Sequence, residues 1–148
     1  MSSMNQPFLH ASSAECEQAF YEALEAADAD AVAQLWLNDD DVCCIHPGGS
    51  RLVGIEAVMA SWRAILHHGP VRIRAISSRS LETPTMAVHN VLEEILIVHE
   101  DQQQLMHVIA TNVYVKTPSG WKMLMHHASP AASEDAAQEL EAPPGLLH

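Results

Sequence analysis

The chain has 148 residues, 48% of them hydrophobic, and a formal net charge of −12 at pH 7. This length and composition are typical of one globular domain with a substantial core. So much negative charge would repel a phosphate backbone, and we therefore expect no nucleic-acid binding. No apolar run has the length of a membrane span, and the first residues lack the pattern of a signal peptide, so we expect no membrane association and a cytoplasmic location.

The spacing of cysteines and histidines does not favour disulfides or metal sites. The three cysteines, Cys16, Cys43 and Cys44, are odd in number and lack metal-type spacing, so we expect reduced, partly buried thiols, with a catalytic cysteine as the less favoured alternative. The histidine pairs at 67–68 and 126–127 do not have a chelating spacing. We expect neither a metal ion nor a cofactor.

Three helices are predicted in the N-terminal half. Ser12 or Ser13 caps the first, which ends near residue 27, and Asp28 caps a shorter second helix. Gly54 opens a third, which ends at residues 67–70. Apolar residues recur at helical spacing in all three segments: Cys16, Phe20, Leu24, Val32, Leu35, Trp36, Val58, Met59, Trp62, Ile65 and Leu66.

Strand patterns fill most of the rest. A short strand before His46 and a return strand at 51–53 flank a glycine turn, and long strands follow from residue 71, at 86–99, at 105–116 and at 121–129. Residues 1–12 are predicted to be a loose arm and 13–130 the folded domain. Residues 131–148 form an acidic tail that can hold a short helix near 133–140.

This order of elements predicts an α+β fold in which the helices cover one face of a curved, mainly antiparallel sheet. The long strands carry more apolar residues than one sheet face can bury. We therefore expect a homodimer that packs sheet to sheet through the outer face.

Seven short motifs, taken in order, carry a family resemblance. They are FYEAL at 20–24, HPGG at 46–49, LVG at 52–54, ASW at 60–62, ATNVY at 110–114, GWKM at 120–123 and HHASP at 126–130. Together they resemble the SnoaL-like branch of the nuclear transport factor 2-like superfamily, which includes ketosteroid isomerase. The resemblance spans residues 14–130 and implies a cone-shaped fold that encloses one pocket.

His46 is the leading catalytic candidate. Pro47 favours an extended backbone at His46, and an imidazole accepts or donates a proton near neutral pH. The resemblance implies that His46 occupies the place of the isomerase general base, since both precede a proline and a glycine-bearing turn. Phe20 stands in place of the oxyanion-binding tyrosine, and Thr111 lies near the second acid, so steroid isomerisation is not supported.

Strand alternation suggests which side chains face the pocket. With Lys122 and Lys116 outward, Met125 and His127 face inward, as do Thr111 and Val113, while Asn112 lies on the opposite face or near a bulge. One of Glu93 and Glu94 is expected to face inward. We predict His46 and His127 as catalytic residues, and the ligand-binding candidates are Phe20, Trp36, Trp62, Glu94, Thr111, Asn112 and Met125.

Each candidate also has a structural interpretation. His127 can be a core imidazole bonded to a backbone carbonyl, and the tryptophans can be packing residues. The functional hypothesis is a small-molecule pocket protein, possible activities being those of a cofactor-independent isomerase, cyclase or hydrolase with a histidine acid or base and a small apolar organic ligand. The alternatives are a non-catalytic ligand carrier and a dimeric interaction module.

Overall fold

The computed structural model describes residues 10–132 and residue 135. Most of the predicted arm (1–12) and tail (131–148), including the predicted helix at 133–140, lies outside the described residues. The elements, in chain order, are α1 (Ser13–Glu25), α2 (Ala29–Leu35), β1 (Cys43–Ile45), β2 (Leu52–Val53), α3 (Ile55–His67), β3 (Arg72–Glu82), β4 (Met86–His99), β5 (Gln102–Thr117) and β6 (Gly120–Pro130).

The helix starts follow the predicted capping chemistry. The Ser12 side chain accepts a hydrogen bond from the Glu15 backbone N–H, and the Asp28 side chain accepts one from the Ala31 N–H. Gly54 precedes α3 with a φ of 92°, a conformation that few residues other than glycine adopt. The three predicted helices and the predicted α+β class are confirmed.

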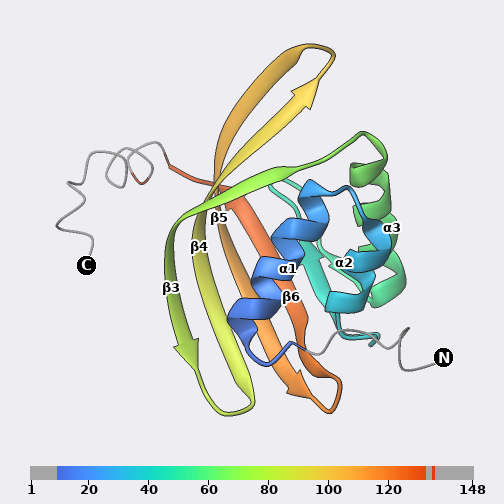
Figure 1. The fold of residues 1–148 in the computed structure, drawn as a ribbon, viewed down its shortest axis with the longest axis vertical. Coiled ribbons are helices and arrows are strands. Elements are labelled where there is room, and N and C mark those ends of the chain that lie inside the picture. The colour runs from blue at the N-terminus through green and yellow to red at the C-terminus, as the bar shows by residue number, and fades with distance from the viewer. Residues whose placement is uncertain (1–9, 133–134, 136–148) are drawn as a thin grey trace.

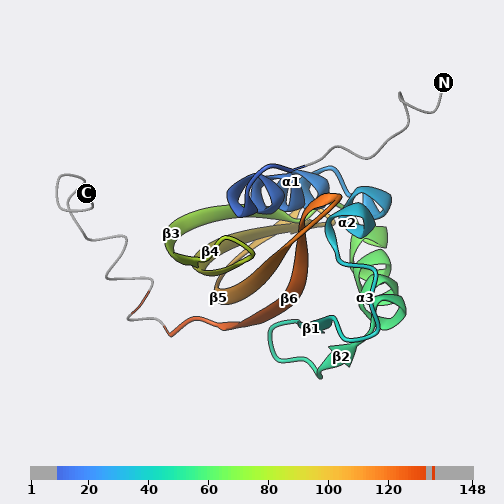
Figure 2. The same ribbon diagram turned by 90° about the horizontal axis from the view of Figure 1, so that it is seen from below.

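The strands form one sheet in the order β2-β1-β6-β5-β4-β3. Strands β3 to β6 pair antiparallel as a meander, whereas β1 pairs parallel to β6. The long strands curve, and the helices gather on the concave side, with α1 lying along the sheet and α3 beside β1 and β2 (Figures 1 and 2). This curvature places β1, α3 and the concave face of the sheet around one space.

Cross-strand register defines the concave face. Glu93 of β4 lies opposite Val108 of β5, and His89 of β4 lies opposite Asn112, which in turn lies opposite His126 of β6. These five side chains are buried. The concave face of the sheet therefore carries several polar groups in an otherwise apolar interior.

A bulge in β6 overturns the predicted facing of its C-terminal half. Val113 pairs with Met125 but Tyr114 pairs with Met123, so Leu124 is an extra residue in β6. After this residue the alternation is reversed, and His126 is buried while Met125 and His127 are exposed. The prediction that Met125 and His127 face inward was wrong.

The predicted facing of β5 was wrong as well. Asn112 and Tyr114 are fully buried on the concave face, whereas Thr111 and Val113 lie on the other face and are only partly buried. The inference relied on Lys116 pointing outward. Lys116 is exposed because it lies near the strand end, beyond the cover of the helices.

The convex face of the sheet carries exposed apolar side chains. They are Leu81, Met86, Val88, Val98, Leu105 and Met125. In the part of the chain that is described, no helix combines the length and apolar character needed to cross a bilayer.

Candidate functional site

A mostly apolar cavity of about 230 Å³ lies between α3, the turn after β1 and the concave face of the sheet. We call it the apolar cavity. It is smaller than the roughly 300 Å³ at which pockets for drug-sized ligands begin, so its ligand must be small. Its lining residues are His46, Pro47, Trp62, Ile65, Val71, Ile73, Glu93, Ile95, Ile97, Met106, His126 and Ala128.

His46 reaches the cavity as predicted, and neighbouring side chains fix its ring. Its Nε2 lies 2.6 Å from the Ser61 hydroxyl on α3 and 3.8 Å from Cys44 Sγ. The ring packs edge-on against Trp62 with centroids 4.7 Å apart. Burial lowers the pKa of His46, so its imidazole is neutral at physiological pH and available to accept a proton.

Glu93 is the carboxyl group of the cavity. It is 1% exposed, and the Tyr21 hydroxyl of α1 donates a 2.7 Å hydrogen bond to its Oε2. Burial raises the pKa of Glu93 to about 7, against an opposing effect of the Tyr21 hydrogen bond. A carboxyl group that titrates near neutral pH can both accept and release a proton.

His126 is the second imidazole of the cavity and is 4% exposed. Its Nδ1 lies 2.6 Å from Asn112 Oδ1, an atom that only accepts hydrogen bonds, so Nδ1 carries the proton. Burial and the nearby His46 lower the pKa of His126 to about 3. The ring is therefore neutral, with an unprotonated Nε2.

Glu94, the predicted ligand-binding residue of the two adjacent carboxyls, faces the convex surface. Arg74 donates to its Oε1 at 3.0 Å, and His107 Nε2 lies 3.3 Å from its Oε2. These cationic and polar contacts lower the pKa of Glu94. The inward carboxyl is thus Glu93, since odd-numbered residues of β4 face the helices.

The remaining candidates divide between core and surface. Phe20 and Trp36 are core residues that do not line the apolar cavity, although Phe20 packs edge-on against Trp62 at 5.4 Å. Trp62 lines it directly. Thr111 accepts a hydrogen bond from Asn90 on the convex face, which also carries Met125 and His127.

Sequence reasoning missed two site residues, Tyr21 and His126. Tyr21 is next to the predicted residue Phe20. Its hydroxyl reaches Glu93 on the sheet because of the way α1 is rotated about its axis. His126 faces inward because of the bulge in β6, and no glycine or other turn residue in the sequence marks that bulge.

Cys16 and Cys44 are not reactive thiols, and the described residues form no group of metal ligands. Burial raises the pKa of both Cys16 and Cys44 to about 12, which keeps these thiols protonated and unreactive. Within residues 10–132 and 135, no three His, Cys, Asp or Glu side chains are grouped as metal ligands.

Comparison with known proteins agrees with the fold. The model of the SnoaL-like domain matches residues 14–133, while none of the curated proteins matches the chain. The chain is similar to a proposed calcium/calmodulin-dependent protein kinase type II association domain from Thiobacillus denitrificans, at 33% identity and a TM-score of 0.75 over 85% of this chain and 100% of that one. It is also similar to a proposed dehydratase of the NTF2-like family from Streptomyces avermitilis, at 31% identity and a TM-score of 0.75 over 80% and 92% of the two chains.

A more distant neighbour shares the fold alone. The CaMKII hub of S. rosetta is 20% identical, with a TM-score of 0.65 over 80% of this chain and 93% of that one. The family model covers nearly the whole described domain. This chain belongs to the SnoaL-like family of the nuclear transport factor 2-like superfamily.

Proposed function

We propose that the protein binds a small, mostly apolar organic molecule in the apolar cavity and catalyses proton transfer on it with its own side chains. The observation that carries this proposal is the burial of Glu93, with a pKa of about 7, in the cavity wall. Glu93 therefore replaces His127 as the partner of His46 in the proposed site.

The proposed step is a reversible proton abstraction. The ionised Glu93 takes a proton from a carbon next to a carbonyl group, leaving an enolate, and the resulting carboxylic acid returns a proton to that carbon or to a neighbouring one. The neutral His46 and His126 hold acceptor or donor positions beside the ligand. Isomerisation, cyclisation, elimination of water and hydrolysis can each include such a transfer, and the relative named as a proposed dehydratase favours elimination among them.

Deuterium exchange tests this step without knowledge of the natural substrate. Cyclohexanone, a small apolar ketone, is incubated with the protein in D₂O at pH 7.5, and loss of its α-proton signals is followed by NMR. We expect exchange above the buffer rate, a decrease of about 100-fold in Glu93→Gln, and a smaller decrease in His46→Gln. Saturable binding without exchange would instead identify a ligand carrier, and absence of binding would refute the pocket hypothesis.

We also propose that two copies pair through the convex face of the sheet. Six exposed apolar side chains on this face support the pairing, since a sheet-to-sheet contact would remove them from water. Two structural neighbours are named as an association domain and a hub.

The three cysteines are free thiols, which favours a reducing compartment such as the cytoplasm.

A further inference from the structure

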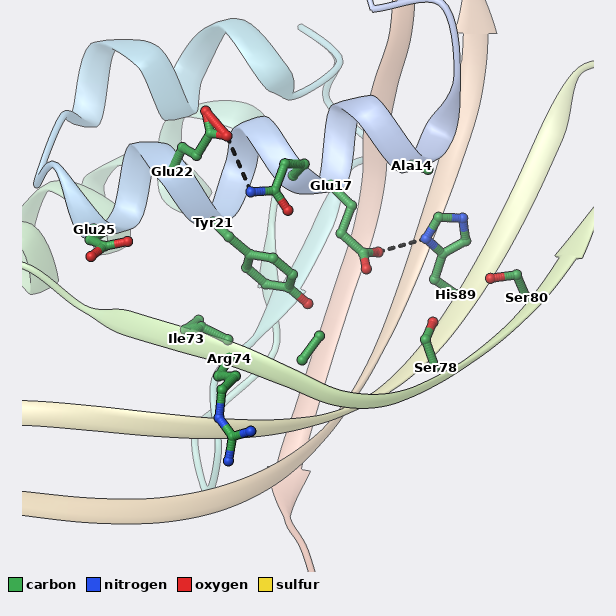
Figure 3. Close-up of a pocket in the computed structure, with 12 residues that line it drawn as sticks. Ala14, Glu17, Tyr21, Glu22, Glu25, Ile73, Arg74, Ser78, Ser80 and His89 are labelled. Carbon is green, nitrogen blue, oxygen red and sulfur yellow. Dashed lines mark hydrogen bonds and ion pairs between the residues drawn. The ribbon is translucent and has the colours of Figure 1, made fainter. Parts of the chain in front are cut away.

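The apolar cavity has a closed end and an open end. Glu93, Ile95 and Ile97 follow one another on the inward face of β4, and all three line the cavity. Their exposed fractions rise from 1% at Glu93 through 8% at Ile95 to 36% at Ile97. At the Glu93 end, Tyr21 and Ile73 separate the cavity from the polar pocket beneath α1 that Figure 3 shows. A ligand whose reacting end lies at Glu93 therefore extends toward Ile97.

A groove of about 290 Å³ begins at the open end of the cavity. We call it the outer groove. It shares Ile65, Val71 and Ile97 with the apolar cavity, and the turn at 68–70 and Val98 complete its lining. With the groove added, the site enters the range of roughly 300–1,000 Å³ that is typical of ligand pockets, which the cavity alone does not reach.

The outer groove forms where the sheet loses one strand. In the described part of the chain, β3 pairs with β4 only as far as Leu96, whereas β4 continues to His99 with β5 as its partner. The outer part of this β4–β5 hairpin extends past the rest of the sheet (Figure 1). The turn between α3 and β3 lies along the unpaired edge, and a 3.0 Å hydrogen bond from the Val71 N–H to the Leu24 carbonyl holds its end. Backbone contacts therefore build the groove before any ligand enters.

The lining of the outer groove favours an alkyl chain. Apart from His68, the side chains that line it are apolar, and the three that it shares with the cavity are aliphatic. Partly exposed side chains change rotamer within nanoseconds, so a chain can pass between them without movement of the backbone.

The length of the cavity indicates the length of this chain. Four residues separate Glu93 from Ile97, which is about 13 Å along a strand at about 3.3 Å per residue. An extended carbon chain advances about 1.3 Å per bond, so roughly ten carbon atoms span this distance.

We propose that the ligand of the apolar cavity is a linear aliphatic carbonyl compound of roughly eight to ten carbon atoms. Its carbonyl end lies beside Glu93, and its alkyl tail passes Ile97 into the outer groove. This substrate class rests on the proposed function, since the Glu93 carboxyl acts at the carbonyl end.

Calorimetric titration of the full chain with 2-butanone, 2-hexanone and 2-octanone tests the tail, because these ketones differ only in chain length. We expect the affinity to rise about fourfold for each added CH₂ group, the usual effect of burying one such group. Methyl NMR should show shifts of the Val98 signals with 2-octanone and none with 2-butanone. Equal affinity for the three ketones would overturn the assignment of the tail.

A charge at the junction of cavity and groove locates the tail. Ile97→Glu should abolish the gain in affinity from 2-butanone to 2-octanone, because the tail would then pass a carboxylate. Val53→Glu is the matched change at a position of β2 that is 50% exposed and lies outside both hollows, and it should keep the gain. An unchanged gain in Ile97→Glu would contradict the proposed path. If Ile97→Glu does not fold, absence of Val98 shifts with 2-octanone in the wild-type protein is sufficient to contradict it.

Cyclohexanone distinguishes failure of the tail from failure of the proposed function. It carries no tail, so its deuterium exchange reports only on the Glu93 end of the cavity. Exchange of cyclohexanone combined with equal affinity for the three linear ketones would overturn the tail and leave the proton transfer supported. A fourfold gain per CH₂ group without any exchange would support the tail and refute the proton transfer.

Discussion

The Tyr21 hydroxyl lies 2.7 Å from Glu93 Oε2 and joins the inner face of α1 to the centre of β4. Ser13, Glu17 and Tyr21 are spaced four residues apart, so all three point from α1 toward the sheet. Ser13 and Glu17 both contact His89, and Tyr21 contacts Glu93. Hydrogen bonds from these three residues hold α1 against the sheet. Glu93 belongs to this network and also lines the apolar cavity.

The raised pKa of Glu93 makes stability depend on pH in a defined direction. The folded state binds this proton more tightly than the unfolded state, so the associated stability is fully present below about pH 4.5 and is lost as the pH rises through about 7. Relative to wild type, Glu93→Gln should gain about 2–3 kcal/mol in unfolding free energy between pH 5 and pH 8. Urea denaturation at a series of pH values measures this gain. Glu94→Gln, the matched change on the convex face, should not show it, and the same slope in both variants would contradict the assignment.

Tyr21→Phe should raise the pKa of Glu93 further. The hydrogen bond from Tyr21 favours the ionised carboxylate, and phenylalanine keeps the ring while removing that donor. ¹³C NMR of the labelled glutamate carboxyl should show a midpoint shifted upward by about one unit. A downward shift would mean that the hydroxyl stabilises the protonated form instead.

His126 should destabilise the fold in acid. Its folded pKa of about 3 lies below the ordinary value of 6.5, so the stability that it confers is present above pH 6.5 and is lost as the pH falls toward 3. Between pH 7 and pH 5 this amounts to about 2 kcal/mol. His126→Gln should remove that loss in denaturation experiments, whereas His127→Gln at the neighbouring exposed position should not. Equal behaviour of the two variants would place the titrating imidazole elsewhere.

Charge on the convex face should separate the proposed dimer. Met125 and Val88 are 38% and 36% exposed there, and a lysine at either position would be buried without a partner in a sheet-to-sheet interface. Light scattering at micromolar concentration should give a dimer mass for wild type and a monomer mass for Met125→Lys and Val88→Lys. Glu56→Lys on α3 should remain dimeric. A monomeric wild-type chain would refute the proposal.

The sequence predicted the elements well because local signals mark most of their ends. The caps at Ser12 and Asp28 and the glycine that opens α3 are short-range features, and the structure agrees with each. His46 was also predictable, since Pro47 and the glycine turn fix a strand end.

The orientation of the site residues was not predictable in the same way. A single extra residue in β6 turns His126 toward the interior and His127 toward the solvent, the reverse of the prediction. Nothing in the sequence near Leu124 distinguishes it from an ordinary strand position. The choice between Glu93 and Glu94 depends on which β4 face α1 covers, a long-range contact made by Tyr21. The prediction therefore failed on which face of each strand a side chain occupies, and not on which residue types form the site.

The titration of Glu93 is the most direct test of the proposed proton transfer. ¹³C NMR of the carboxyl carbon in the full-length protein, assigned by its loss in Glu93→Gln, follows this group from pH 3 to pH 9. The proposed site requires a midpoint near 7, the value that burial imposes. A midpoint at or below the ordinary 4.5 would mean that the carboxyl is solvated and ionised near neutral pH, and Glu93 would then not be the group that accepts and returns the proton.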